Sequence, residues 1–321
     1  MKLGAFTALF GDQPLDVALD YLQEVGFEAV ELYAGALAPP VHCDPAILLH
    51  SKAELSKFKD SLERHRMTLS MLNASGNPIS PDRDLAKRHH GAFENAVRLA
   101  EKIGVAGVIV FSGCPGGSPG DRTPNWVTCP WPEEYLSVLE YQWNDVLIPY
   151  WQKAARFAAD HGVTQLAFEM HPGFCVYNPE SLLKLRAAVG SIIGANFDPS
   201  HLFWQGIQAD KAILQLGEAI YHFHAKDTRI FTDNVASNGV LDPKHYGRLT
   251  DRAWIFATVG YGQPEATWKK IIDALAVVGY DYVISIEHED ALMSKKEGIE
   301  KAYHFLRRLM IAERPGEMWW A

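Results

Sequence analysis

The sequence predicts a single (β/α)8 barrel, and three observations lead to that fold class. Apolar runs typical of buried strands alternate eight times with helix-like stretches along the 321 residues. The first run leads into Phe6-Thr7-Ala8-Leu9-Phe10-Gly11, which lacks the glycine-rich phosphate turn of a doubly wound open sheet. Four later runs end in polar side chains, as strands do at the mouth of a barrel. We therefore expect one barrel domain over residues 1–312 and a C-terminal tail over residues 313–321.

Each element follows from its pattern and its end signals. The first helix has helix-spaced apolar residues and stops at Gly26. Asp82 is a good N-cap for a long helix that ends before Gly104. The run 105–111 is almost wholly apolar, which indicates a strand buried on both faces. By these criteria we expect strands at 2–6, 27–33, 67–73, 105–111, 164–170, up to 198, 219–225 and 281–287, and helices at 15–25, 52–65, 82–103, 132–161, 178–189, 209–216, 264–278 and 295–310.

Two long segments interrupt the alternation, at 112–132 after the fourth strand and at 226–263 after the seventh. Long loops in a compact domain usually form lids, binding loops or subunit contacts. Trp126 and Trp131 in the first segment could stack on a sugar face, or pack at the rim or against a second subunit. The tail carries Trp319 and Trp320, which are costly to leave in water. We expect that pair to dock on the body or on a neighbouring subunit of a homo-oligomer.

Composition excludes several classes of protein. The chain is 48% hydrophobic and 21% charged, as in ordinary globular proteins. Its net charge of −9 disfavours a nucleic-acid partner. No apolar run approaches the roughly 20 residues of a membrane span, and the N-terminal segment resembles a strand more than a signal peptide. The four cysteines lack zinc-finger or CxxC spacing, which suggests reduced thiols. We expect a cytoplasmic protein with no membrane contact.

Four strand ends carry candidate metal ligands. They are Glu169, Asp198, His224 and Glu287, on the last four predicted strands. Parallel barrel strands emerge on one face, so these side chains can converge on a single cation. Three carboxylates and one imidazole suit Mn²⁺ best, with Mg²⁺, Co²⁺ and Zn²⁺ as alternatives. Without a cation the carboxylates would repel one another. Any one of them alone could instead be a helix cap or part of a rim salt bridge.

Other polar residues lie close to these ends. His171 and His201 follow their carboxylates by two and three residues, so we expect them at the rim, in contact with substrate. Lys226, two residues beyond His224 on the same face, could hold a substrate oxygen or form a surface salt bridge. His222, two residues before His224, is predicted to be a core histidine one layer deeper in the barrel.

These strand ends resemble those of the xylose isomerase-like barrel superfamily of sugar phosphate isomerases and epimerases. The resemblance spans essentially the whole chain. It rests on Phe168-Glu169, Asp198-Pro199-Ser200-His201, Val259-Gly260-Tyr261-Gly262, His224-Ala225-Lys226-Asp227 and Ile286-Glu287. It implies that Glu169, Asp198, His224 and Glu287 bind one divalent metal, that the two glutamates exchange a proton with a sugar carbon, and that His201 holds a substrate oxygen.

The resemblance and the residues together predict a metal-dependent sugar or keto-sugar isomerase or epimerase. A metal on a carbonyl and its neighbouring hydroxyl acidifies the C–H between them and stabilises the enediolate. One glutamate removes the proton and the other can return it to the opposite face. His171 is not part of the simple epimerase pattern. As an extra acid or base it would fit a lyase, dehydratase or deglycosidase acting on a 3-oxo-sugar or inosose.

Two further classes remain as alternatives. DNA-repair endonucleases share this barrel and these four positions but hold three zinc ions, and need histidines at the ends of the third and fourth strands. Those ends are Asn73 and Phe111-Ser112. A non-catalytic sugar-binding protein has no need of two opposed carboxylates at a metal. The identity of the sugar, and whether it is phosphorylated or oxidised, stays open.

Overall fold

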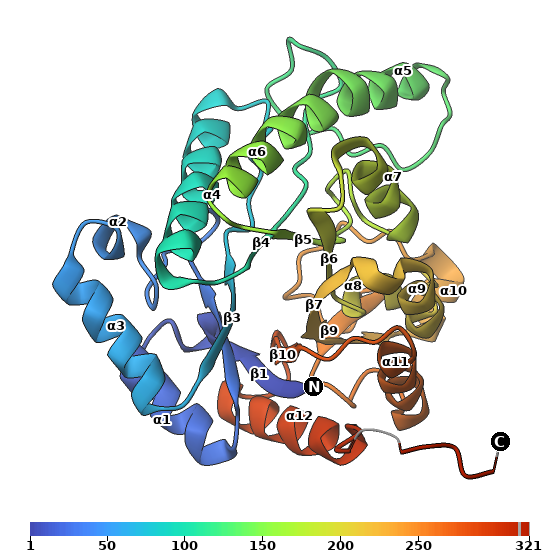
Figure 1. Ribbon diagram of the computed structural model, residues 1–321. Coiled ribbons are helices and arrows are strands. Elements are labelled where there is room, and N and C mark those ends of the chain that lie inside the picture. The colour runs from blue at the N-terminus through green and yellow to red at the C-terminus, as the bar shows by residue number, and fades with distance from the viewer. Residues whose placement is uncertain (314–315, 321) are drawn as a thin grey trace.

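Eight parallel strands close into a barrel in the computed structural model, which describes residues 1–313 and 316–320 (Figure 1). The order around the barrel is β1-β10-β7-β6-β5-β4-β3-β2, so sequential barrel strands are neighbours throughout. This confirms the predicted fold class. The barrel strands are β1 (Lys2–Phe6), β2 (Ala29–Tyr33), β3 (Thr68–Asn73), β4 (Gly107–Val110), β5 (Gln165–Glu169), β6 (Ile193–Phe197), β7 (Ile220–Ala225) and β10 (Val283–Ile286).

Helices surround the barrel (Figure 1). Glycines end two of them because only a left-handed residue closes the last turn there: Gly26 (φ 110°) follows α1, and Gly104 (φ 78°) follows α4. Asp82 caps α4 by accepting from two backbone N–H groups, as predicted. The helices are α1 (Leu15–Val25), α2 (Pro45–Leu48), α3 (Lys52–Arg64), α4 (Arg83–Ile103), α5 (Glu134–Glu140), α6 (Ile148–Asp160), α7 (Pro179–Val189), α8 (Ser200–Phe203), α9 (Ala209–Leu216), α11 (Glu265–Val277) and α12 (Lys295–Leu309), with short 3₁₀ turns η1 (Thr7–Phe10) and η3 (Gly217–Ala219).

The helix predicted over 132–161 has the expected extent but not a uniform type. A π-helical segment, η2 (Tyr141–Leu147), joins α5 to α6. It contains the buried Gln142, whose side-chain amide donates to the carbonyls of Asn125 and Gly116. These bonds join the long 112–132 loop to the π-helical segment, so that the loop is anchored without regular structure of its own.

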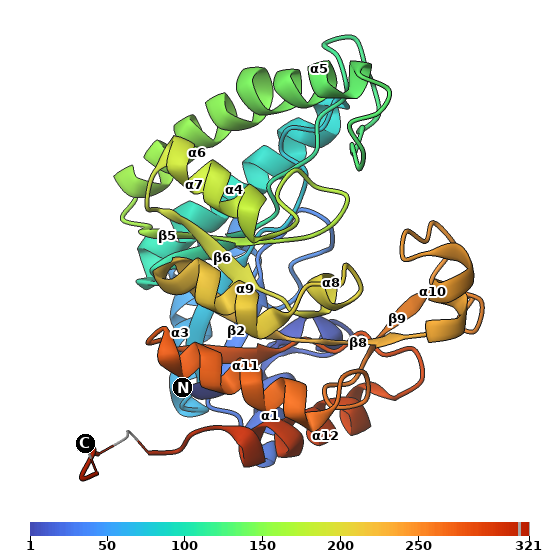
Figure 2. The same cartoon turned by 90° about the vertical axis from the view of Figure 1, so that its right-hand side faces the viewer.

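The second long segment contains regular structure that the sequence did not reveal. Strand β8 (Asp227–Ile230) pairs antiparallel with β9 (Trp254–Ala257), and α10 (Thr232–Asn238) follows β8. We call residues 227–257 the arm; Figure 2 shows it projecting beyond the barrel. The Asp227 carboxylate accepts from the backbone N–H groups of Gly260 and Gln263 and from the indole of Trp268. These bonds fix the base of the arm, so Asp227 has a structural role.

The C-terminal tail was expected to dock either on the body of the chain or on a neighbouring subunit, and the first placement is wrong. Trp319 is 89% exposed and Trp320 is 70% exposed, so neither is docked on the body of the chain. Contact with a neighbouring subunit stays a prediction. Of the predicted tail, residues 314, 315 and 321 lie outside the described residues. Within the part of the chain that the structure describes, no helix is long and apolar enough to cross a membrane.

Candidate metal centre

The four predicted ligands come together at one end of the barrel. Glu169 is the last residue of β5, Asp198 and Glu287 directly follow β6 and β10, and His224 lies near the end of β7. These four strands are consecutive neighbours in the barrel. One ligand atom from each residue lies within 4.8 Å of the others. His224 Nδ1 is 3.0 Å from Glu287 Oε2 and 3.4 Å from Glu169 Oε2. The residues therefore have the proximity that a shared cation requires.

Unsatisfied atoms in this cluster point to the same conclusion. Asp198 Oδ2, His224 Nδ1 and Glu287 Oε2 are buried and form no hydrogen bond among the described residues. Their contacts with one another and with His201 and Lys226 are ion pairs of 3.0 to 3.7 Å that lack hydrogen-bond geometry. Leaving a buried polar atom unpaired costs about 1–3 kcal/mol, and native structures contain few such atoms. Three of them in a single cluster are explained if a cation binds there. The donor set, with one imidazole and three carboxylates, fits a divalent metal ion.

The charges around the cluster are strongly coupled. Burial, then the charge of Glu287, raises the pKa of Glu169. Burial also raises the pKa of Asp198, against the opposing effects of His201 and Lys226. Burial opposes ionisation of Glu287 as well, but nearby Lys226 and His224 outweigh it and lower the pKa of Glu287. The carboxylates thus depend on positive charge at this spot, which a divalent cation would also supply.

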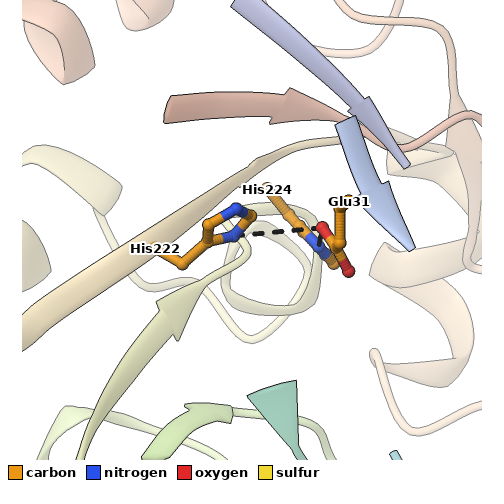
Figure 3. Close-up of side chains that lie close together, drawn as sticks. All are labelled: Glu31, His222 and His224. Carbon is orange, nitrogen blue, oxygen red and sulfur yellow. Dashed lines mark hydrogen bonds and ion pairs between the residues drawn. The ribbon is translucent and has the colours of Figure 1, made fainter. Parts of the chain in front are cut away.

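Glu31 is a functional candidate that the sequence did not identify. It lies on β2, fully buried, and its Oε2 accepts from His224 Nε2 at 2.6 Å and from Ser285 Oγ at 3.0 Å. Oε1 accepts from the Asn73 side-chain amide at 2.8 Å. Figure 3 shows Glu31 facing the imidazoles of β7. A carboxylate behind a ligating imidazole fixes the ring and its tautomer, and here it leaves Nδ1 to face the cluster.

His222 occupies the deeper position that was predicted. Its Nδ1 lies 2.9 Å from Asn196 Oδ1, and its Nε2 lies 3.1 Å from the Ser70 hydroxyl oxygen, both at hydrogen-bond distance. Burial lowers its pKa to about 4, so it is neutral. Glu31, His222 and His224 lie close enough to hold a metal. Both nitrogens of His222 are already hydrogen-bonded, however, and Glu31 is satisfied by three donors. We therefore interpret these three residues as a support for the metal centre.

The three predicted substrate-binding residues surround the cluster. His201 Nε2 donates to Glu169 Oε1 at 3.1 Å, so His201 contacts a candidate ligand directly. Lys226 is buried, with Nζ 3.2 Å from Glu287 Oε2 and 2.7 Å from Glu289 Oε2, and is not part of a surface salt bridge. His171 is half-buried; its ring lies 4.0 Å from that of His201, and its Nδ1 donates to the Pro172 carbonyl. Their contact with substrate stays a prediction.

A cavity of about 440 Å³ lies beside these residues. We call it the arm cavity, because residues of the arm form one side of it. The loop after β10 and the rim of β5 supply the rest. By contrast, Trp126 lines a separate cavity, and Trp131 is 73% exposed. Of the two long segments, it is therefore the second that roofs this cavity. The lining residues are His171, Tyr246, Leu249, Ile255, Phe256, Glu289 and Ala291.

The fold is a (β/α)8 barrel, and its strand-end cluster has a donor set that could hold a divalent metal. Residues 19–309 match the family described as xylose isomerase-like TIM barrel, and the chain belongs to that family. It is 39% identical over 310 residues to the uncharacterized protein YfiH of Bacillus subtilis, covering 96% of this chain and 99% of YfiH. The resemblance predicted from the strand ends is thereby confirmed.

Solved structures resemble the chain at the level of the fold. The probable 3-DHS dehydratase AsbF from Bacillus anthracis, involved in petrobactin synthesis, aligns with a TM-score of 0.66 at 18% identity, over 96% of this chain and 99% of AsbF. The IolI protein with a bound zinc atom gives a TM-score of 0.65 at 19% identity, over 96% and 98% of the two chains. A D-tagatose 3-epimerase-like protein gives 0.63 at 18% identity, over 96% and 97%.

Proposed function

We propose that the protein is a divalent-metal-dependent isomerase or epimerase of a sugar or keto-sugar. The observation that carries this proposal is the set of buried atoms without a hydrogen bond on Asp198, His224 and Glu287, which lie with Glu169 in one four-residue cluster. A cation held by these residues would polarise a substrate carbonyl and lower the pKa of the adjacent C–H. The zinc bound to IolI and the epimerase-like neighbour support the same class of chemistry.

The chain's own residues can move the proton. Glu169 and Glu287 are the outer members of the four-strand set, with β6 and β7 between their strands. We assign one as the base that removes a proton from the sugar carbon and the other as the acid that returns it. Glu169, whose pKa burial raises, is the better proton acceptor of the two. Lys226 and His201 would orient substrate oxygens, since both already lie among these carboxylates.

A lyase or dehydratase acting on an oxidised sugar is the second candidate. Its specific support is His171, which lines the arm cavity and commits Nδ1 to the Pro172 carbonyl. Nε2 is then the nitrogen available to a substrate group, for example to accept a proton during elimination. The likeness to the dehydratase AsbF is consistent with this chemistry.

Solvent exchange tests the proposal. With added Mn²⁺ in heavy water, one member of a panel of ketoses, 3-oxo-sugars and inososes should take up deuterium at a single carbon. Glu169→Gln and Glu287→Gln should each slow that uptake by about 10²–10⁴-fold, the usual contribution of a positioned acid or base. Glu63→Gln, on the exposed side of α3, is the matched control and should exchange like the wild type.

Metal content separates the remaining classes. One Mn²⁺-like ion per chain supports the sugar enzyme, three zinc ions would indicate an endonuclease, and no metal would indicate a binding protein. Full metal occupancy in both glutamate variants, or exchange undiminished in both, would refute the site. An unsaturated product that accumulates during exchange would favour the lyase over the epimerase.

A further inference from the structure

We propose that the arm cavity is a subsite for a second ring, joined to the sugar that reacts at the metal centre. The natural substrate would then be a glycoside whose second ring, sugar or aryl, presents an apolar face to the arm. This inference rests on the proposed sugar chemistry and adds a substrate class to it.

The cavity lies beside the four candidate metal ligands and is not lined by them. Its volume is about 440 Å³. Small-molecule sites usually enclose about 300–1,000 Å³, so the cavity alone is large enough for a ligand group. It is nevertheless continuous with the rim of the centre, because His171 and Glu289 belong to its lining and Glu289 is paired with Lys226.

One wall of the cavity is aromatic and rigidly held. The rings of Tyr246 and Phe256 stack at 5.7 Å with an interplanar angle of 19°. The guanidinium of Arg252, which is 1% exposed, lies 4.3 Å from the centre of the Tyr246 ring. Tyr246 is still 50% exposed. An aromatic ring that is fixed by its neighbours and open to the cavity can stack on a ligand ring at little entropic cost.

The aromatic wall also reaches the metal centre. The Phe256 ring lies 5.5 Å from the ring of His201, and Lys226 Nζ lies 4.4 Å from its centre. His201 and Lys226 both contact candidate metal ligands. A molecule with one ring at the metal and a second ring on Tyr246 and Phe256 would therefore touch one continuous surface. Glu289 offers a carboxylate at the polar side of the cavity, suited to accept hydroxyl hydrogen bonds.

Calorimetric titration of the full-length protein with Mn²⁺ tests the subsite. The probes are the methyl and phenyl β-glycosides of glucose and galactose, with cellobiose and lactose. At least one two-ring probe should bind about tenfold more tightly than its methyl glycoside. Tight binding of phenyl glycosides alone would identify an aryl group, and tight binding of the disaccharides a sugar; either supports the subsite. Equal binding of one-ring and two-ring probes, or no binding of any two-ring probe, would overturn it.

Variants of the arm locate the effect. Tyr246→Ala and Phe256→Ala should reduce the two-ring preference to about one. Tyr261→Ala is the matched control, because Tyr261 is similarly exposed at 45% but does not line the cavity. It should keep the full preference. If Tyr246→Ala retains that preference and instead changes the chain's oligomeric state, the aromatic wall is a subunit contact and the proposal fails.

Failure of this inference can be told from failure of the proposed function. In one outcome, a free monosaccharide takes up deuterium as fast as its glycosides do and binds as tightly as they do. That result would overturn the subsite and keep the isomerase. A two-ring preference that Tyr246→Ala removes, in a protein that binds no metal and exchanges no deuterium, would keep the subsite and overturn the isomerase.

Discussion

Two layers of the barrel interior meet at His224 and differ in how their polar atoms are satisfied. In the upper layer, at the strand ends, Asp198 Oδ2, Glu287 Oε2 and His224 Nδ1 have no hydrogen-bond partner among the described residues. In the lower layer, Glu31 accepts from three donors and both nitrogens of His222 are bonded. Both layers are buried and both combine carboxylate with imidazole.

The contrast distinguishes a candidate binding site from the residues that support it. Buried polar groups are hydrogen-bonded unless something else satisfies them. The lower layer satisfies itself and so can hold His224 in one orientation. The upper layer leaves atoms without a hydrogen bond, as expected if a bound ligand completes them. His224 belongs to both, with Nε2 bonded below to Glu31 and Nδ1 facing the cluster above. Substitutions in the two layers should therefore have different effects.

The largest difference is expected in the stability of the metal-free protein. Glu31→Ala removes the carboxylate partner of a buried imidazole and should lower the free energy of unfolding by about 3–5 kcal/mol. Asp198→Asn should lower the free energy of unfolding only slightly or raise it, because burial raises the pKa of Asp198 and the amide carries no charge. Urea denaturation with excess chelator at pH 7 measures both variants.

The same pair has an expected pH dependence. A carboxyl whose pKa is raised by folding contributes stability below its unfolded pKa and loses that contribution as the pH rises through the folded pKa. Any gain in Asp198→Asn relative to the wild type should therefore shrink as the pH falls toward 3.8, the ordinary value for Asp198. An Asp198→Asn variant as unstable at pH 7 as Glu31→Ala would remove the distinction between the layers.

Metal should stabilise the wild-type protein through the upper layer. A ligand present at 100 times its Kd stabilises the native state by about 2.7 kcal/mol. For a chain of this size that corresponds to a rise in Tm of about 4 °C or more. Glu287→Gln should abolish the rise, and Glu63→Gln should keep it. Thermal scans with and without Mn²⁺ measure the shift; a full shift in Glu287→Gln would exclude Glu287 as a ligand.

Glu31→Gln should weaken metal binding without removing it. The amide has nearly the shape of the carboxylate but no charge to hold the Nε2–H of His224. Loss of a partner behind a ligating histidine typically costs 10–100-fold in metal affinity. Competition with a fluorescent chelator would measure this affinity, and the stoichiometry should stay at one ion per chain. Unchanged affinity would mean that His224 needs no support from β2.

Much of this site follows from local patterns in the sequence. The bounds of β1 and α1 match their predicted ranges, and the four ligand candidates follow from polar residues at the ends of apolar runs. Each of these sequence signals lies within one strand and the turn that follows it, so it can be recognised without knowing the fold. The period of two along β7 likewise placed His222 below His224, and the structure confirms this position.

The remaining features depend on contacts distant in sequence. Glu31 lies 193 residues from His224, so nothing local identifies its partner, although a charged residue between Val30 and Leu32 in an apolar strand is itself a signal of buried polar structure. The strands of the arm have four residues each and lie far apart in the chain. Such short runs resemble loop sequence, which explains why the segment was expected to lack regular structure.

The smallest effect on metal binding is expected for substitution of His222. This variant tests whether the lower layer only supports the metal centre. In His222→Gln we expect the side-chain amide to keep only one of the ring's contacts with Asn196 and Ser70, so a buried hydrogen bond should be lost. That costs about 1–3 kcal/mol of stability. Metal affinity and stoichiometry should equal those of the wild type, measured by the same chelator competition. Loss of the ion in this variant would instead place the metal between Glu31, His222 and His224, the second cluster whose ligand atoms are close enough to hold one.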